Sequence, residues 1–353
     1  MRVTWKRCLA ILIMAPFLFW GLLLSGCQSE ERLKSEWLTV AIIDSQGRSS
    51  IWLVDPQTGK KKVLLNNREV MLSGKLSSDG NWLAYTDAIG DGPWDAFLLN
   101  IKNNMVYQVT HDRQLQFNLR FANNDNQVIY AKVGGVTSWV PKIAKIDINK
   151  KEAKIVVNGN QDLAVEAFDI AKGKIIAVTY SFNEDIKRHQ EANEKGLKEP
   201  SPMMYHFIVT NLDGTAVKEV AQIKARNVDS VSWGPRGDTV VFGGSGVDSK
   251  NENGIYQLGV KEGKISMLLS ETEVNNSSQT IKLFLFKRFA VLSADDRNIY
   301  FNAVPIGSKE GIFDNNILSY PSAVYSYDRE KKNIKKVFQE SNSFVTDLNI
   351  TYH

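Results

Sequence analysis

A polar turn followed by an alternating apolar run recurs along this chain and constrains its fold more than any other feature. The first copy, LSSDGNWLAY at Leu76–Tyr85, places Asp-Gly between two apolar runs. Because glycine adopts positive φ without steric cost, this arrangement predicts a tight turn between antiparallel strands. Further copies follow at Phe121–Tyr130, Trp233–Phe242 and Leu292–Phe301, with a weaker one at Phe168–Val178. Their spacing of about 45 to 65 residues is typical of propeller blades with loop insertions.

A second apolar strand accompanies each repeat and, in five of six units, ends in Asp or Asn before a turn rich in Gly, Asn or Lys. These strands are Ile51–Asp55, Ala96–Asn100, Ile143–Asp147, Phe207–Asn211, Ile255–Leu258 and Val324–Asp328. A final strand follows each turn, such as Lys62–Leu65. Each unit therefore reads as four antiparallel strands, a to d, with period-2 patterning. This pattern predicts an all-β fold, a β-propeller of four-stranded antiparallel blades.

The strand count predicts six blades over residues 37–353 and a particular closure of the ring. The first blade begins directly with its strand b at Leu38–Ile43, so its strand a is missing there. At the other end, Phe344–Tyr352 forms an unassigned strand after a complete sixth blade. We expect this C-terminal strand to supply strand a of the first blade, because closure removes an exposed edge. The alternative is that it caps the outside of the sixth blade.

The repeat resembles the TolB-type, WD-like repeats of bacterial β-propellers, whose blades carry an "SPDG…IAF…IY…D…G" pattern. The resemblance covers nearly all of the chain after its N-terminal segment and implies the same blade architecture. Among the copies, however, Asp-Gly is intact only at Asp79-Gly80, and the fourth blade is eroded. TolB also has an N-terminal α/β domain, for which we expect no counterpart here. The partners of TolB are therefore not carried over to this chain.

The N-terminus has the layout of a secretion signal. A basic MRVTWKR segment precedes a long apolar stretch that ends in Leu24-Ser25-Gly26-Cys27. This ending resembles the lipobox of bacterial lipoproteins, which implies a signal peptide at 1–26, lipidation of Cys27 and a tether at 27–36. The implied location is the extracytoplasmic face of a cell membrane, in either a Gram-positive or a Gram-negative envelope. The alternative is an uncleaved transmembrane anchor.

Insertions in this chain concentrate between strands b and c of the predicted blades. They are Asp87–Asp95, Val133–Pro141, Phe182–Pro202, Gly244–Asn253 and Val304–Ser322. All b–c loops of a four-stranded antiparallel blade emerge on one face, so insertions confined to them predict a binding surface there. Residues 181–200 read as a short charged helix with an N-terminal cap at Asn183, either a docking element or a solvated surface helix.

Aromatic side chains in or beside these insertions are the candidate binding residues, because aromatic anchors among polar neighbours suit protein or glycan recognition. The candidates are Trp94, Trp139, Tyr180, Phe182, Phe313 and Tyr320, together with His189 of the predicted helix. The alternative for any of these rings is packing of the loop against the propeller. We expect no metal and no cofactor, because the four histidines form neither a His-x-x-x-His pair nor an HExxH motif.

Two functional hypotheses follow. The first is a non-enzymatic, lipid-anchored binding or scaffold module for an envelope protein or a cell-wall glycan. The second is a carbohydrate-active propeller, a hydrolase or lyase, that uses two carboxylates across the channel. Its candidate acids are Asp87, Asp95, Glu184, Asp185, Asp248 and Asp314. Nucleic acid is not an expected partner, because the net charge of +4 falls to about +1 without the N-terminal Arg2, Lys6 and Arg7.

Overall fold

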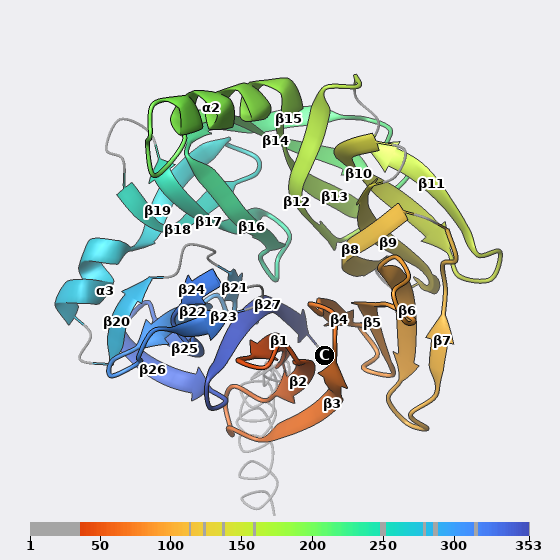
Figure 1. Ribbon diagram of the computed structural model, residues 1–353, viewed down its shortest axis with the longest axis horizontal. Coiled ribbons are helices and arrows are strands. Elements are labelled where there is room, and N and C mark those ends of the chain that lie inside the picture. The colour runs from red at the N-terminus through yellow and green to blue at the C-terminus, as the bar shows by residue number, and fades with distance from the viewer. Residues whose placement is uncertain are drawn as a thin grey trace, which may run out of the picture. The chain divides into compact units, whose positions relative to one another are not determined.

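The computed structural model of the protein describes residues 36–353 with short gaps. Left out are residues 113, 123–124, 136–137, 158–159, 248–251, 278–279, 285–288, 314–316 and 353. In the described part, six antiparallel sheets stand around a central axis as a six-bladed β-propeller (Figure 1). The all-β class and the blade count predicted from the repeats are confirmed. Cys27, Asp248 and Asp314 lie outside the described residues, as does the predicted signal peptide.

Blades 1 to 3 each contain four strands, which follow one another from the channel outward. Blade 1 consists of β27 (Ser343–Tyr352), β1 (Glu36–Asp44), β2 (Ser49–Val54) and β3 (Lys61–Arg68). Blade 2 consists of β4 (Gly74–Leu76), β5 (Trp82–Asp87), β6 (Asp95–Asn100) and β7 (Val106–Gln108). Blade 3 consists of β8 (Gln114–Ala122), β9 (Asp125–Gly135), β10 (Ser138–Asp147) and β11 (Glu152–Val157).

Blades 4 to 6 continue the ring. Blade 4 consists of β12 (Leu163–Ala171), β13 (Lys174–Ser181), β14 (Met203–Asn211) and β15 (Lys218–Ala225). Blade 5 consists of β16 (Asn227–Trp233), β17 (Thr239–Val247), β18 (Glu252–Gly259) and β19 (Lys264–Ser270). In blade 6 the inner position is shared by β20 (Ile281–Phe284) and β21 (Ala290–Leu292), which both pair with β22 (Asn298–Pro305). β25 (Ala323–Asp328) and β26 (Asn333–Phe338) complete this blade.

The hydrophobic core lies between the blades. Six clusters of buried side chains occur, one at each interface between neighbouring blades. Alternate residues of one strand pack against the two neighbouring blades. Ile176 and Val178 of β13 pack toward blade 5, whereas Ile175 and Ala177 pack toward blade 3. Both faces of an inner strand are therefore buried, while outer strands such as β3 are largely exposed.

The repeated turn between strands a and b is built by the same contacts in different blades. In blade 2, Ser77 Oγ donates to Asp79 Oδ1 (2.5 Å) and accepts from the Trp82 N–H (3.0 Å). Ser293, Asp295 and Asn298 repeat these contacts in blade 6 at 2.5 and 2.8 Å. Where blade 2 has Gly80 at φ 68°, blade 6 has Asp296 at φ 60°, because Asp tolerates the left-handed region. The copy in blade 6 thus keeps the turn geometry although it lacks the Asp-Gly pair.

The C-terminal strand closes the ring. β27 pairs antiparallel with β1 from Glu36↔Tyr352 to Asp44↔Ser343, with one irregularity at Ala41. β27 is thereby the innermost strand of blade 1, as predicted, and does not cap the outside of blade 6. The Tyr352 hydroxyl also donates to the Leu292 carbonyl of blade 6 (2.9 Å). The two ends of the described chain therefore hold each other in place.

The b–c insertions differ in form from simple loops. Val133–Pro141 lies mostly within the long β9–β10 ribbon, and Val304–Ser322 contains the hairpin of β23 (Gly311–Phe313) and β24 (Ile317–Ser319). The predicted charged helix is present as α2 (Phe182–Glu194), but its N-cap is Ser181, whose hydroxyl accepts from the Glu184 N–H (3.1 Å). The predicted cap at Asn183 was wrong, because the strand β13 runs directly into the helix.

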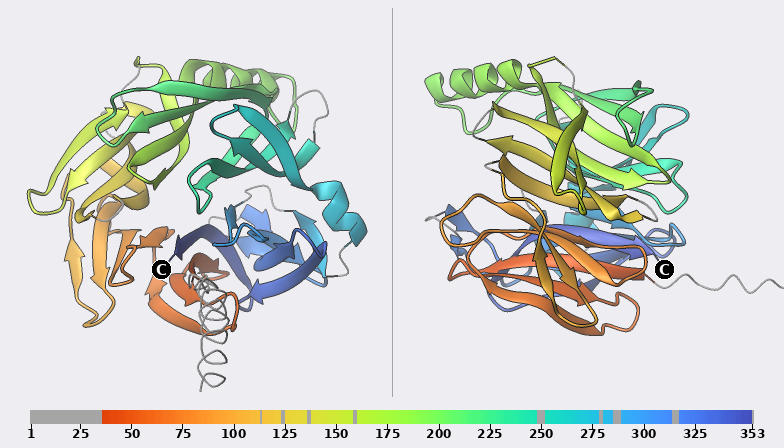
Figure 2. Two further views of the ribbon diagram at one scale, coloured as in Figure 1. Left: turned by 180° about the vertical axis from the view of Figure 1, so that it is seen from behind. Right: turned by 90° about the vertical axis from the view of Figure 1, so that its right-hand side faces the viewer.

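One further helix, α3 (Glu271–Ser277), connects blades 5 and 6. In the side view of Figure 2, α2 lies on one face of the propeller and the C-terminus on the other. We call these the b–c face and the turn face, the latter carrying the short a–b and c–d turns. Over the described residues, no helix combines the length and the apolar character that a membrane span requires.

We predict that deleting residues 343–353 destabilises the propeller strongly. The deletion exposes the edge of β1 and removes buried Leu348 and Ile350, each worth about 2 to 5 kcal/mol on truncation. Thermal and urea unfolding followed by circular dichroism measure the effect, with a chain ending after Tyr352 as control. A 343–353 deletion that unfolds cooperatively at the parent midpoint would contradict closure by β27.

Candidate binding face and central channel

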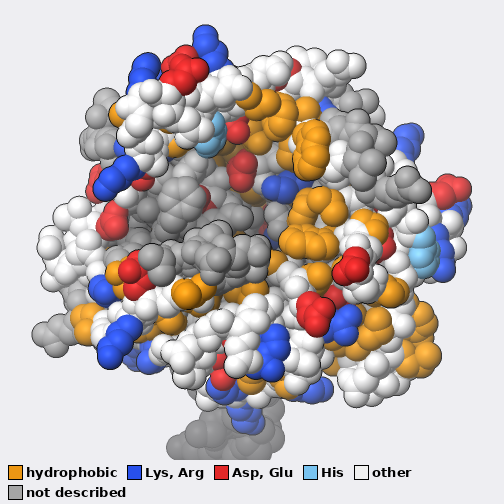
Figure 3. Space-filling view, in the orientation of Figure 1, with side chains coloured by type: hydrophobic (Ala, Val, Ile, Leu, Met, Phe, Trp, Pro, Cys, Tyr) orange, Lys and Arg blue, Asp and Glu red, His pale blue; other side chains and the backbone are white. Residues whose placement is uncertain are grey.

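Exposed apolar side chains gather on the b–c face. Among the described residues, eleven large hydrophobic side chains are exposed, and six of them belong to b–c insertions, so this face is enriched in them. The six are Ile89, Trp139, Ile186, Leu197, Ile306 and Ile312. Figure 3 views this face and shows hydrophobic side chains gathered beside the central hollow. Exposed apolar groups rimmed by polar ones are typical of protein–protein interaction surfaces.

Trp139 is the candidate residue that the structure leaves most accessible. It lies near the start of β10 on the b–c face, and 76% of its surface is exposed. Ile89, in the insertion of the neighbouring blade 2, is 66% exposed. A tryptophan on the end of a rigid β-ribbon can bury a large area on a partner with little loss of conformational freedom.

Three other candidate rings are partly or wholly engaged in packing. Trp94 meets Phe117 edge-on, with ring centroids 5.4 Å apart. Tyr180 is buried in the core between blades 4 and 5, where its ring lies 5.9 Å from that of Tyr205, and burial raises the pKa of its hydroxyl. Phe182 packs against the same core. Tyr180 and Phe182 therefore pack against the propeller, which was the alternative to a role in binding.

Helix α2 is held firmly on blade 4. Arg188 is buried and donates to the carbonyl oxygens of Ser201 and Arg226 (3.0 Å each), and it pairs with Asp185 at 2.6 Å. His189 on the adjacent position is exposed, with Nδ1 2.8 Å from the Asp185 carbonyl oxygen. The helix therefore presents His189 and Ile186 on a fixed platform.

The remaining candidates belong to blade 6. Tyr320 is half-buried, and the Lys282 ammonium lies 4.0 Å from its ring centroid. Phe313 ends strand β23, and its side chain lies outside the described part of the structure. The candidate residues thus come from the b–c sides of blades 2, 3, 4 and 6.

The candidate loop carboxylates that can be described are mostly engaged within the chain. Buried Asp87 pairs with Arg68, and Asp185 pairs with Arg188. Asp95 accepts from Thr110 (2.8 Å) and from Gln108 (2.9 Å), while burial raises its pKa. Glu184 lies exposed in the first turn of α2. Over the described ranges, no three His, Cys, Asp or Glu side chains come together as a metal site would need.

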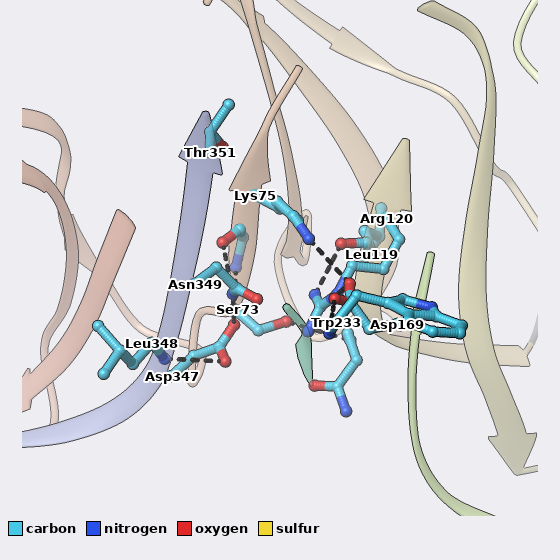
Figure 4. A network of polar contacts seen from close by, with 12 residues as sticks. Ser73, Lys75, Leu119, Arg120, Asp169, Trp233, Asp347, Leu348, Asn349 and Thr351 are labelled. Atoms are coloured by element: carbon cyan, nitrogen blue, oxygen red, sulfur yellow. Dashed lines mark hydrogen bonds and ion pairs between the residues drawn. The ribbon is translucent and has the colours of Figure 1, made fainter. Parts of the chain in front are cut away.

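A buried charge cluster in the central channel was missed by the sequence reasoning. Asp169 of β12 accepts from Lys75 of β4 (2.8 Å) and from Arg120 of β8 (3.1 Å) through one oxygen. Its other oxygen accepts from the Trp233 N–H of β16 (2.9 Å), as Figure 4 shows. This one carboxylate therefore joins blades 2, 3, 4 and 5 across the channel. Its signal in the sequence is a charged residue within an otherwise apolar inner strand.

The closing strand joins the same network from blade 1. Asp347 accepts from the Gly74 N–H (3.2 Å) and from Asn349 Nδ2 (2.8 Å), and Asn349 also donates to the Gly74 carbonyl (3.0 Å). Burial raises the pKa of Asp347. For Asp169 burial acts in the same direction, but Lys75 and Arg120 outweigh it and lower the pKa. Toward the turn face, the cluster borders a pocket of about 190 Å³ lined by Ser78, Ser232 and Thr351.

No family model matches this chain. The uncharacterized protein YdjN of Bacillus subtilis (strain 168) is 27% identical over 175 residues, which are 48% of this chain and 46% of YdjN. The chain thus spans about half the length of the curated relative it matches.

Among solved structures, TolB from Acinetobacter baumannii is similar with a TM-score of 0.62 and 10% identity, covering 99% of this chain and 74% of that one. A nidogen/laminin complex chain has a TM-score of 0.59 at 9% identity, covering 90% and 98%. A putative TolB from Agrobacterium tumefaciens has a TM-score of 0.53 at 10% identity, covering 91% and 99%. At these identities the likeness shows the six-bladed β-propeller fold alone, in accord with the resemblance seen in the repeats.

We predict that Asp169→Asn destabilises the protein by about 3 to 5 kcal/mol, because it leaves two buried cations without their shared counter-charge. The pKa of Asp169 lies below its ordinary value of 3.8, so the stabilisation is complete at neutral pH and is lost as the pH falls through that lowered pKa. The difference between parent and variant should therefore shrink below about pH 3.8.

Urea unfolding at pH 7 and at pH 3 measures both effects. Exposed Asp91→Asn is the matched control and should change stability by less than about 0.5 kcal/mol. An Asp169→Asn protein as stable as its parent at pH 7 would show that the channel cluster does not hold the blades together.

Proposed function

We propose that this protein is a lipid-anchored, extracytoplasmic propeller that acts without catalysis, binding an envelope protein or a cell-wall component through its b–c face. The observation that carries the proposal is the concentration of exposed apolar side chains on b–c insertions, with Trp139 and Ile89 the most exposed. The c–d turns of the opposite face are only four to six residues long, so the longer connections are those of the b–c face. Such an asymmetry favours recognition on a repeat scaffold.

The rigidity of the scaffold supports this function. Blades that share buried cores and a central ion cluster hold insertions from different blades at fixed separations. A preorganised surface loses little entropy when a partner binds. A stable complex needs about 800 Å² from each partner, an area that insertions from several neighbouring blades can supply together.

The topology supports an anchor that leaves this face available. β1 begins at Glu36, opposite Tyr352, on the turn face. A chain anchored through Cys27 therefore reaches the propeller from the turn face, and the b–c face lies on the other side of the ring. Wall components and envelope proteins can approach that side without obstruction by the tether.

We predict that Ile89→Ser combined with Trp139→Ala reduces partner recovery at least tenfold, because each substitution removes an exposed apolar anchor. Recovery is measured by cross-linking and affinity capture of the full chain from detergent-solubilised membranes, with circular dichroism on every variant. The matched control is Met105→Ser with Val217→Ser, two exposed apolar residues of c–d turns. Loss of the partner in the control and not in the b–c variant would show that the turn face binds instead.

We predict that Cys27→Ala yields a precursor that carries no lipid and retains residues 1–26, because the thiol of Cys27 is the proposed lipid acceptor. Metabolic labelling with palmitate and intact-protein mass spectrometry test this. The propeller should unfold at the parent midpoint, since Cys27 precedes its first strand. Normal palmitate labelling of the variant would contradict lipidation at this residue.

A further inference from the structure

Basic side chains outnumber acidic ones in the c–d turns of the turn face. The six connections between strands c and d contain eight basic and four acidic residues, so this rim carries an excess of positive charge. Lys60, Lys102, Lys150, Lys151, Lys261, Lys331 and Lys332 are all exposed.

The lysines are densest where blades 6 and 1 meet. Lys60 to Lys62 lie at the start of β3, and Lys331, Lys332, Lys335 and Lys336 lie in and after the c–d turn of blade 6; all seven are exposed. The two outer strands line a common groove that includes Lys61 and Lys336. We call these seven residues the lysine cluster.

Two carboxylates beside these lysines, Asp55 and Asp328, bond to their own turns, whereas exposed Glu330 pairs with Arg297 and Glu340 pairs with Lys61. Asp55 Oδ1 accepts from the N–H groups of Gln57 (2.9 Å) and Thr58 (3.1 Å). Asp328 Oδ1 accepts from Glu330 (3.0 Å) and Lys331 (2.9 Å), and the bond from the Lys331 N–H lowers its pKa. These carboxylates lie within the turns, whereas long lysine side chains extend beyond them. With seven exposed lysines against these few acids, the junction of blades 6 and 1 carries an excess of positive charge.

The described chain begins at the junction of blades 6 and 1. Glu36, the first described residue, is buried against blade 6, where it accepts from the Tyr300 hydroxyl (2.6 Å) and the Ala294 N–H (2.5 Å). The eight residues from Gln28 to Ser35 span at most about 29 Å when fully extended. A membrane anchor at Cys27 therefore keeps the junction of blades 6 and 1 within this distance of the bilayer. Electrostatic attraction between lysines and headgroups acts over a Debye length of about 10 Å, so it holds the face once the face lies on the membrane.

We propose that the lysine cluster docks on the anionic headgroups of the lipid bilayer, so that the propeller stands with its turn face on the membrane and its b–c face outward. The proposal rests on the membrane tether of the proposed function and deepens it. A single lipid chain gives weak, reversible attachment, and a basic patch beside it supplies the second attachment that stable anchoring needs. The same contact fixes the direction in which the b–c face is presented.

Lysine footprinting of the full chain in vesicles tests the orientation. The protein is reconstituted in phosphatidylcholine vesicles with or without one quarter phosphatidylglycerol, and acetylation of each lysine is followed by mass spectrometry. In 50 mM salt, we expect the lysine cluster to react at least threefold more slowly in the anionic vesicles, and 1 M salt should abolish the difference. Lys187, Lys195 and Lys198, exposed in or beside α2, should react equally in both.

A variant pair separates charge from proximity. Replacing Lys331, Lys332, Lys335 and Lys336 by Gln should remove the protection of Lys60 to Lys62, whereas Lys187→Gln with Lys195→Gln and Lys198→Gln should leave it unchanged. Equal reaction in both kinds of vesicle, or protection of the α2 lysines, would overturn the proposal. The vesicles receive the chain purified from membranes, with the lipid on Cys27 verified by intact-protein mass spectrometry, so the footprint is read separately from palmitate labelling and from partner capture.

Discussion

The pairing of β27 with β1 is the interaction on which the rest of the propeller depends. A four-stranded blade cannot bury both faces of its inner strands alone, and each core cluster needs the next blade to complete it. In an open ring the first and last blades would each lack a neighbour, leaving an unpaired strand edge beside exposed apolar surface. The β27–β1 ladder pairs the last strand with the first, so closure gives every blade a neighbour on both sides.

The channel cluster adds a second constraint, which acts across the ring rather than around it. Asp169 holds Lys75, Arg120 and the Trp233 backbone, while Asp347 brings the closing strand to Gly74. Charged groups at such depth are tolerated only when they satisfy one another. A shift of one blade would break several of these contacts at once, so the cluster resists sliding of the blades and keeps their insertions in register.

The two faces of the ring have different character for the same topological reason. Connections b–c emerge beside α2 and display apolar residues such as Trp139, whereas c–d turns stay short and display lysines. The chain joins the propeller on the lysine side, because strand b of the first blade begins there. In the proposed function one face serves attachment and the other recognition. The separation of the two kinds of connection follows from the antiparallel order of four strands in each blade.

The sequence by itself determined the strand pattern, the six blades, the closing strand and the presence of a helix at 182–194, because each leaves a local signal in turn residues or in periodicity. It did not determine the channel cluster, since Lys75, Arg120 and Asp169 come from three blades and meet only after the ring closes. Nor did it separate Trp139, which is exposed, from Tyr180, which is buried, because both follow the same alternation near a loop. Burial depends on the neighbouring blade, and only the tertiary structure places that neighbour.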